Sequence, residues 1–522
     1  MFIRVKPSGS REYLQIVENR WEGGRPRQYV IATLGRLDRL KASGQIDTMI
    51  KSLSRFSEKV KVIEGYKEGK LSALSVKKIG PELVIGRLWK ELGINEVLNK
   101  LLEGRRHRFE VERAVYFTVI SRLFFPGSDR KASWMGRDYK IEGVDGLLNL
   151  HHLYRAMAWL GDVKDEVEEG LFLRNRDLFT GLNLVFFDTT SIYFEGNGGE
   201  SLGQYGYSKE RRSDERQMIV GAVIDSTGRP ISCPMWPGNT ADIKTLIPVV
   251  ERLKGRFGVT DIVIVADRGV VSKEAVEDLE SLGIGYILGV KMRKEKEISA
   301  DVLSRAGKYR EVRDNLKVKE VKAEGRRYIV CLNAEEAERD ATQRQAIIET
   351  LKEKLKEGAK ALIGNRGYRR YLKIEKTSIQ VKEERIKSEE RFDGKYVLRT
   401  NTELSAEEVA LRYKELWQVE RIFRALKSIL ETRPIYHKYD STIKGHVFCS
   451  FLALVVMKEL MSRIDVKSDW DKIRHDLDPL YEVKVMHEGK SYLLRSPLQG
   501  VSGKILKAVG IAPPPVVTEA RT

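Results

Sequence analysis

The stretch LNLVFFD, residues 182–188, is an apolar run of strand length that ends in an acid. A second run, IVIVA at 262–266, is followed in the same way by Asp267. Short apolar runs rich in β-branched and aromatic residues predict buried strands. Because the carboxyl ends of parallel strands are where α/β sheets place their ligands, we expect Asp188 and Asp267 to lie together at one sheet edge.

The segments around these two runs have the pattern of an α/β core. Residues 218–225 and 230–236 alternate as two strands, and the turn sequence STGR joins them as a hairpin. The full order is strand, strand, strand, helix, strand, helix, strand, which fits a mixed sheet covered by helices. This is the ribonuclease H-like order if the next core helix is the one at 405–430. The remaining expected elements are helices at about 241–255 and 272–282 and a strand at 284–290.

The helical stretch LRYKELWQVERIFRALKSIL at 411–430 carries Tyr413, Glu420 and Lys427 at intervals of seven residues. Seven residues at about 100° each come within roughly 20° of two full turns, so we expect the three side chains on one helix face. An acid between a phenol and an ammonium suits a site for metal and phosphate. A solvated charged helix held by i,i+4 ion pairs is the alternative interpretation. Two further cations lie within one turn of the acid, Arg421 and Arg424.

Three carboxylates, Asp188, Asp267 and Glu420, are therefore expected to meet, with no His or Cys nearby. Such a donor set favours Mg²⁺ or Mn²⁺ over zinc. Two ions roughly 4 Å apart would activate a water or a 3′-hydroxyl and stabilise the leaving oxygen of a phosphodiester. The alternative is that each aspartate is only a turn or capping residue after its strand.

Length and charge set the broad class of protein. The 522 residues exceed one ordinary domain, and the formal charge of +18 favours a polyanionic partner. We expect nucleic acid rather than membrane, although thermophilic proteins are also rich in Lys and Glu.

Cysteines and apolar runs indicate the compartment. The three cysteines are scattered, which argues against disulfides and zinc and fits a reducing cytosol. The first residues have no apolar stretch typical of a secretory signal. The longest apolar run, 447–457, is too short to span a bilayer, so we expect a buried helix and no membrane partner.

Composition changes along the chain predict five regions. The first is expected to be a β-hairpin with a basic tip, and the second a helical region that binds DNA or serves as a scaffold. A charge-dense, mostly β insertion subdomain interrupts the catalytic core, and a C-terminal region ends in a disordered tail. In order, the ranges are 1–45, 46–180, 181–290 with 405–465 for the core, 291–404 for the insertion, and 466–522.

The motif around Glu420 resembles that of the bacterial and archaeal insertion-sequence transposases of the DDE type. It is most similar to the insertion-sequence-four group of the transposase DDE domain family, which has a β insertion before its catalytic Glu. That group carries the signature Y-(2)-R-(3)-E-(6)-K. Tyr413, Glu420 and Lys427 match the signature, whereas Leu416 stands at the Arg position. Further stretches that resemble the family are FDTTS (187–191), GYSKERRSD (206–214), PGNTAD (237–242) and VADRG (265–269).

The resemblance implies a DNA transposase that binds insertion-sequence ends, cleaves them and joins them to target DNA. Hydrolysis and transesterification would depend on two Mg²⁺ or Mn²⁺ ions, held by the catalytic residues Asp188, Asp267 and Glu420. The implied partners are the terminal inverted repeats, target DNA and a second copy of the chain on DNA. The implied location is the bacterial or archaeal cytoplasm, in association with the nucleoid. The residues implied to contact DNA phosphates are Tyr413, Lys427, Arg421, Arg424, Lys209, Arg211 and Arg212.

Two other classes of function fit the same residues. A structure-selective nuclease with a ribonuclease H-like fold would use the same metals without strand transfer. A DNA-binding regulator descended from a transposase would be expected to have lost part of the acid triad, yet all three acids are present. The remaining candidates, His446, His151 and His152, are left outside the catalytic set, because a lone His that opens an apolar helix is usually structural.

Overall fold

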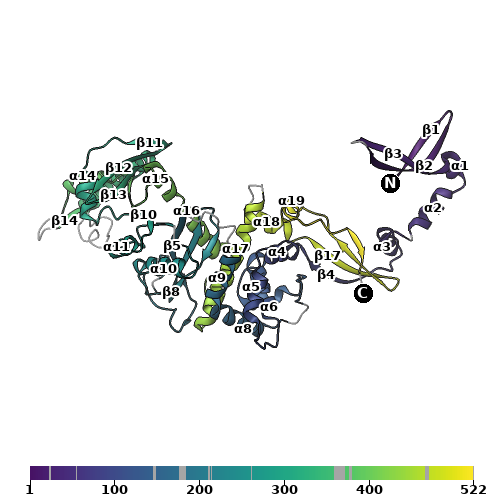
Figure 1. Ribbon diagram of the computed structural model, residues 1–522, viewed down its shortest axis with the longest axis horizontal. Helices are drawn as coiled ribbons and strands as arrows, with labels where there is room; N and C mark the ends of the chain where they lie inside the picture. The colour runs from purple at the N-terminus through teal and green to yellow at the C-terminus, as the bar shows by residue number, and fades with distance from the viewer. Residues whose placement is uncertain are drawn as a thin grey trace. The chain divides into compact units, whose positions relative to one another are not determined.

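The protein divides into two compact units, Met1–Gly80 with His475–Thr522, and Pro81–Arg474 (Figure 1). Each unit is described by itself. The computed structural model describes the chain except for residues 23–24, 55, 145–147, 176–183, 210–211, 213, 260–261, 358–370, 375–378, 465–468 and 521–522.

The first unit begins with a three-stranded antiparallel sheet. Two strands were expected here, but β1 (Phe2–Ser8) adds a third by pairing with β2 (Arg11–Glu22), which also pairs with β3 (Arg25–Arg36). A two-residue loop joins β1 to β2, and its first residue, Gly9, has a φ of 60°. Tight hairpin loops need such positive φ values, which glycine adopts without strain. Three helices follow: α1 (Leu37–Ala42), α2 (Gln45–Ser54) and α3 (Glu58–Lys67).

A second sheet in this unit joins strands from both ends of the chain. Its order is β19-β18-β17-β4, and Val62 of α3 packs against Val485 and Tyr492 of this sheet. Strand β4 falls within the region expected to be helical, and β19 falls within the tail expected to be disordered. The helical region therefore includes a strand, and the tail is ordered at β19, because these short segments gain ladder hydrogen bonds from distant strands. The elements are β4 (Ser72–Lys78), β17 (Tyr481–His487), β18 (Lys490–Arg495), α19 (Ser502–Ala508) and β19 (Val517–Glu519).

The second unit contains a helical layer around α17 (Asp440–Arg463), which packs against α6 and α8. A side chain at Gly161 would clash with the carbonyl of Ser441, and one at Gly445 would clash with the carbonyl of Met157. The two glycines therefore let α8 and α17 approach closely. The other helices are α4 (Gly80–Glu91), α5 (Ile94–Leu102), α6 (Val111–Phe124), α7 (Asp129–Met135), α8 (Leu150–Asp162), α9 (Lys164–Arg174) and α18 (Trp470–Leu477).

Helix α17 contains the apolar run 447–457. Within the described ranges it is the one helix long and apolar enough to cross a membrane, and 78% of its most apolar window is buried inside the protein. Such burial is typical of a core helix, as expected from the sequence.

The large sheet of the second unit contains the two strands with which the sequence analysis began. Strands β5, β9 and β10 are parallel neighbours, and β6 pairs antiparallel with β5. From one edge the order is β7-β6-β5-β9-β10, with β8 pairing with β6. The bounds are β5 (Leu184–Tyr193), β6 (Gln217–Asp225), β7 (Pro230–Ser232), β8 (Met235–Pro237), β9 (Val263–Ala266) and β10 (Gly285–Gly289).

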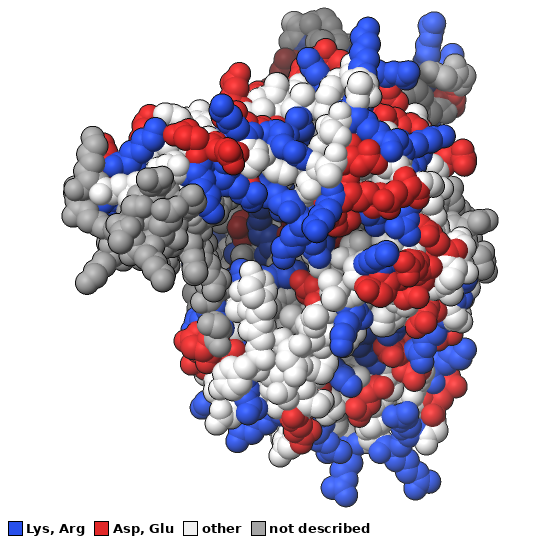
Figure 2. Space-filling model, turned by 90° about the vertical axis from the view of Figure 1, so that its left-hand side faces the viewer, with Lys and Arg blue, Asp and Glu red and all other residues white. Residues whose placement is uncertain are grey.

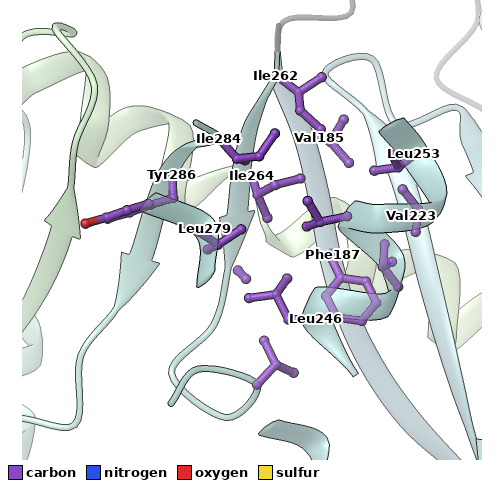
Figure 3. Packing of buried hydrophobic residues seen from close by; sticks show 14 of the residues in the cluster. Val185, Phe187, Val223, Leu246, Leu253, Ile262, Ile264, Leu279, Ile284 and Tyr286 are labelled. Atoms are coloured by element: carbon purple, nitrogen blue, oxygen red, sulfur yellow. The ribbon is translucent and has the colours of Figure 1, made fainter. Parts of the chain in front are cut away.

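One face of this sheet is covered by α10 (Leu246–Gly255) and α11 (Lys273–Ser281), which follow the short η2 turn (Asp242–Lys244). Val185 and Phe187 of β5 pack among the side chains of these helices (Figure 3). Because side chains alternate along a strand, Asp188 lies on the opposite face.

The insertion 291–404 extends the same sheet, and its strands β14 and β15 pair with each other in a separate two-stranded sheet. Its strand β16 pairs antiparallel with β10, and the order runs on through β13 and β12 to β11. The insertion was expected to be a mostly β subdomain with a helix at about 334–357. That helix is α12, and the described residues also contain α14 and the π-helical turn η3. The pairing covers the edge of β10, which would otherwise expose unpaired backbone groups. The elements are η3 (Ile298–Val302), β11 (Arg310–Arg313), β12 (Leu316–Ala323), β13 (Arg326–Leu332), α12 (Ala334–Glu357), β14 (Leu372–Ile374), β15 (Ile379–Val381), α14 (Glu383–Glu390) and β16 (Lys395–Thr400).

The helix expected over 405–430 is broken into three parts. These are α15 (Ala406–Lys414), α16 (Trp417–Arg424) and the π-helical turn η5 (Ala425–Ile429). At the first break, the amide of Leu416 donates to the carbonyl of Tyr413, a tighter turn than an α-helix has. The assumption of a uniform 100° per residue was therefore wrong.

Candidate active site

The two aspartates lie at adjacent positions of neighbouring parallel strands. Phe187 of β5 pairs in register with Ala266 of β9, so the residues that follow them, Asp188 and Asp267, are neighbours. The sequence pattern predicted that Asp188 ends its strand, but it does not. Strand β5 continues to Tyr193 because β6 pairs with it from Val185 to Tyr193.

A cavity of about 320 Å³ brings the three predicted acids together. Asp188 and Asp267 line it from the sheet, and Glu420 lines it from α16. None of the described residues that line it is His or Cys, so its donors are oxygens, which suits Mg²⁺ or Mn²⁺. The other lining residues are Glu336, Tyr396, Tyr413, Lys414, Leu416 and Trp417.

Lys209 is a described cation that lies within salt-bridge distance of Asp188. Its ammonium lies 4.0 Å from Asp188 Oδ1 and 3.2 Å from Asp242 Oδ2, and it donates to the carbonyl of Thr189 at 2.6 Å. Burial raises the pKa of Asp188 to about 6, and the charges of Asp267 and Asp242 add to the rise. Lys209 and the Thr189 amide, which donates to Asp188 Oδ1 at 2.7 Å, oppose it. Lys209, predicted to contact DNA, thus balances part of the acids' charge.

Tyr413 holds Asp267 in place. Its hydroxyl donates to Asp267 Oδ1 at 2.6 Å, and burial together with the Asp267 charge raises the pKa of the phenol well above its usual value. Tyr396 of β16 stacks on the Tyr413 ring with centroids 5.9 Å apart. A side chain at Gly289, the last residue of β10, would clash with the Tyr413 hydroxyl. The glycine and the second tyrosine therefore fix the position of the phenol.

Lys427 contacts the same strand as Asp188. Its ammonium donates to Thr190 Oγ1 at 2.6 Å, and Thr190 shares a sheet face with Asp188 because the two are two residues apart. Burial, with a smaller effect from Lys209, lowers the pKa of Lys427 to about 8. Despite the broken helix, Tyr413, Glu420 and Lys427 all face the β5–β9 region.

The remaining predicted cations that the structure describes make contacts with other residues or are exposed. Arg421 and Arg424 are exposed on α16, and Arg421 stacks over Trp417 at 5.2 Å. Arg212 lies over the ring of Tyr193 at 4.7 Å and pairs with Glu215 at 3.3 Å. Arg211 lies outside the described residues.

Three residues near the acids were not predicted from the sequence. Glu336, at the start of α12, and Tyr396 come from the insertion, and Gly289 ends β10. No local pattern distinguishes them, because their role depends on the pairing of β16 with β10.

A second cluster of ligand-type residues lies elsewhere in this unit. Asp129, His437 and His446 are the one described trio whose candidate ligand atoms all lie within 4.8 Å of one another. Arg122 fills this cluster, since its Nη2 lies 2.7 Å from Asp129 Oδ1 and 2.9 Å from His446 Nδ1. The other nitrogen of His446 faces the carbonyl of Thr432 at 3.0 Å. The guanidinium thus contacts two of the atoms that a cation would need, Asp129 Oδ1 and His446 Nδ1, which favours a structural role for this cluster.

The site therefore has three acids, two above adjacent parallel strands and one on a nearby helix, with oxygen donors and cations around them. Such an arrangement is typical of enzymes that act on phosphodiesters.

The comparisons with known families agree. The family model described as transposase DDE domain matches residues 180–456, more than half of the chain, and the protein belongs to this family. The model of the IS1634 family transposase, N-terminal domain, matches residues 3–69. No curated protein matches the chain. The predicted resemblance to the insertion-sequence DDE transposases is confirmed.

Proposed function

We propose that the protein binds the ends of an insertion sequence, cleaves them and joins them to target DNA. The observation that carries this proposal is the meeting of Asp188, Asp267 and Glu420 at one cavity in a chain of this family. The strand order β7-β6-β5-β9-β10, with three antiparallel strands followed by two parallel ones, supports a ribonuclease H-like core at 181–290 and 405–465.

The three acids would hold two divalent ions, Mg²⁺ or Mn²⁺. When bound, such ions would activate the attacking water or 3′-hydroxyl and stabilise the leaving oxygen. Tyr413 fixes one carboxylate oxygen of Asp267 through a hydrogen bond. Hydrogen-bond partners of this kind orient a carboxylate for binding to a metal ion. Lys209 limits the mutual repulsion of Asp188 and Asp242.

The cations would guide the DNA backbone to the acids. Figure 2 shows Lys and Arg side chains gathered around a hollow on one face of the protein. Leu416, which stands at the signature Arg position, lines the acid cavity, and so does Lys414 two residues earlier. We propose that Lys414 supplies the phosphate contact that Leu416 cannot make. The other proposed phosphate contacts are Tyr413, Lys427, Arg421, Arg424, Lys209, Arg211 and Arg212.

The proposal extends to the assembly. Two paired ends require two active sites, which favours a homodimer on DNA that contains the terminal inverted repeats. The helical segment within 46–180 and the N-terminal region would bind the repeats, in the cytoplasm of a bacterium or archaeon and on its nucleoid.

The experiment that tests this function is a strand-transfer assay with Mg²⁺. Its substrates are duplex ends taken from the inverted repeats that flank the gene, together with a target plasmid. The wild type is expected to join the 3′ ends to the plasmid, and Asp188→Asn is expected to yield neither cut nor joined product. Cut ends without joined product would show a nuclease, and equal products from both proteins would place the chemistry elsewhere.

A further inference from the structure

A cavity of about 680 Å³ lies beside the helical layer and is separate from the acid cavity. Ligand pockets typically measure about 300 to 1,000 Å³, so it could hold a small organic group. Its walls come from the start of α7, from α8, from the chain between η5 and α17, and from α17 itself. The lining residues that bear on its ligand are Arg130, Tyr154, Arg433, Tyr436, Lys438 and Tyr439.

Three tyrosines give this cavity exposed aromatic faces. Tyr436, Tyr439 and Tyr154 are 61%, 62% and 38% exposed. Large apolar rings that stay open to solvent at a cavity wall are surfaces on which a planar ligand can stack. At the back, His437 packs edge-on to Tyr154 and lies 3.3 Å from Asp129 Oδ2. The wall thus combines stacking surfaces with polar groups that can contact a ring edge.

Cations surround the tyrosines. Arg130, Arg433 and Lys438 line the cavity against two acids, and one of these, Asp129, is already paired with Arg122. A simple inorganic anion would use only the cations, and an apolar ligand would use only the three rings. A nucleotide, which has a planar base and a phosphate, needs both.

The cavity also lies along a line of cations that starts at the acids. On β5, Asp188 is followed by Thr190, which binds Lys427, and by Tyr193, whose ring is covered by Arg433 at 5.6 Å. Five strand residues span about 16 Å. Arg433 both contacts the end of β5 and lines the cavity, so a strand that leaves the acids along β5 reaches it.

We propose that this cavity binds an unpaired nucleotide of a DNA strand whose cleavage site lies at the acids. The base stacks on Tyr436 and Tyr439, and its phosphates contact Arg433, Lys438 and Arg130. This inference rests on the proposed action on DNA, and it adds a binding site outside the catalytic cavity.

Fluorescence of 2-aminopurine in a short single-stranded DNA tests the site. The full chain is titrated in EDTA, so that no cleavage occurs. Because stacking contributes about 1 to 3 kcal/mol per base, Tyr436→Ala with Tyr439→Ala is expected to weaken binding about 5- to 150-fold and to remove the quenching. The Tyr→Phe pair keeps the rings and is expected to bind as the wild type does. Tyr205→Ala, an exposed tyrosine outside the cavity and outside the proposed phosphate contacts, serves as the matched control.

Each result bears on the proposal. Unchanged binding by the Ala pair, or equal losses in the Ala and Phe pairs, would overturn it. Tighter binding of free dAMP than of the oligonucleotide would assign the cavity to a mononucleotide instead of a strand and would also overturn it. Asp188→Asn is expected to bind the oligonucleotide normally while failing in strand transfer. The failure of this site and the failure of the proposed function are therefore distinguishable.

Discussion

Two clusters in the unit Pro81–Arg474 contain side chains of the kinds that hold metal ions. They differ in how closely a positively charged side chain approaches the acids. The Asp129–His437–His446 cluster is tight, and Arg122 lies inside it with its side chain 1% exposed. Burial opposes ionisation of Asp129, but Arg122 and the two histidines keep its pKa well below its usual value. The acid cavity has looser geometry: the Lys209 ammonium lies 4.0 Å from Asp188, and Lys414 lines the cavity.

The difference shows that proximity of ligand atoms alone does not define a metal site. A cluster with its own buried cation is already neutralised, and a metal ion would add repulsion. Among the described hydrogen bonds of the acid cavity, none joins a cation to Asp188, Asp267 or Glu420. Burial raises the pKa of Asp188 to about 6. The looser cluster is therefore the better candidate for catalysis, and the tighter one holds α6, α7 and α17 together.

The largest expected effect is on catalysis. Asp188→Asn, Asp267→Asn and Glu420→Gln should each lower strand cleavage by about a thousandfold or more, because each removes a carboxylate that the chemistry requires. Gel assays of end cleavage measure this effect. Asp301→Asn, a surface carboxylate paired with Arg305, is the control and should leave cleavage unchanged. Cleavage within tenfold of the wild type in any of the three variants would contradict the assignment.

The next effect concerns the stability of the tight cluster. Arg122→Met leaves the buried Asp129 carboxylate without its guanidinium and should lower the free energy of unfolding by about 3–5 kcal/mol. Urea unfolding followed by circular dichroism measures the change. Adding Asp129→Asn to this variant removes the stranded charge and should restore part of the loss. A single variant as stable as the wild type would show that Arg122 does not neutralise the cluster.

A smaller effect tests how the acid cavity is positioned. Gly289→Ala places a methyl group against the Tyr413 hydroxyl and should lower cleavage about 10- to 100-fold, as should Tyr413→Phe. The affinity of both variants for Mn²⁺ should fall together with their cleavage rate. A loss of DNA binding alone would not lower the affinity for the metal. Gly255→Ala is the matched control, since a side chain there meets no atom within 4 Å. Normal metal affinity in both Gly289→Ala and Tyr413→Phe would remove the positioning role of the phenol.

The smallest effect is a pH dependence that belongs only to the tight cluster. Burial, with Arg122 and His437, lowers the pKa of His446 to about 3, although Asp129 opposes the shift. The unfolded chain therefore takes up a proton below about pH 6.5 that the folded protein does not, and stability falls as the pH falls. From pH 7 to pH 5 this contribution amounts to about 2 kcal/mol.

The His446→Gln variant isolates that contribution, because an amide can still accept from Arg122 and donate to Thr432. Its stability should change less than that of the wild type between pH 7 and pH 5, as measured by urea unfolding at each pH. Parallel losses in the two proteins would show that His446 does not cause the acid sensitivity.

The positions of the two aspartates could be predicted from the sequence because strand length, apolar content and alternation are local properties. Phe187 and Asp188 face opposite sides of β5 for that reason. The break at Leu416 could not be predicted, since 411–430 contains neither Gly nor Pro. Tertiary contacts, such as the bond from Tyr413 to Asp267, accompany the break.

Contacts between distant segments were also beyond the sequence pattern. Arg122 and His446 are 324 residues apart, and neither belongs to a recognisable motif. The approach of Glu336 to the acids depends on the pairing of β16 with β10, which a local pattern does not encode. The family resemblance supplied the roles of the acids, but it did not indicate the place of Gly289 beneath the Tyr413 hydroxyl.

The most direct measurement is the binding of Mn²⁺ to the full chain, followed by electron paramagnetic resonance of the free ion. The wild type and His437→Gln should bind Mn²⁺ equally, whereas Asp267→Asn should bind it at least about tenfold more weakly. The opposite pattern, with binding kept in Asp267→Asn and lost in His437→Gln, would place the metal in the tight cluster and contradict the assignment of the catalytic site.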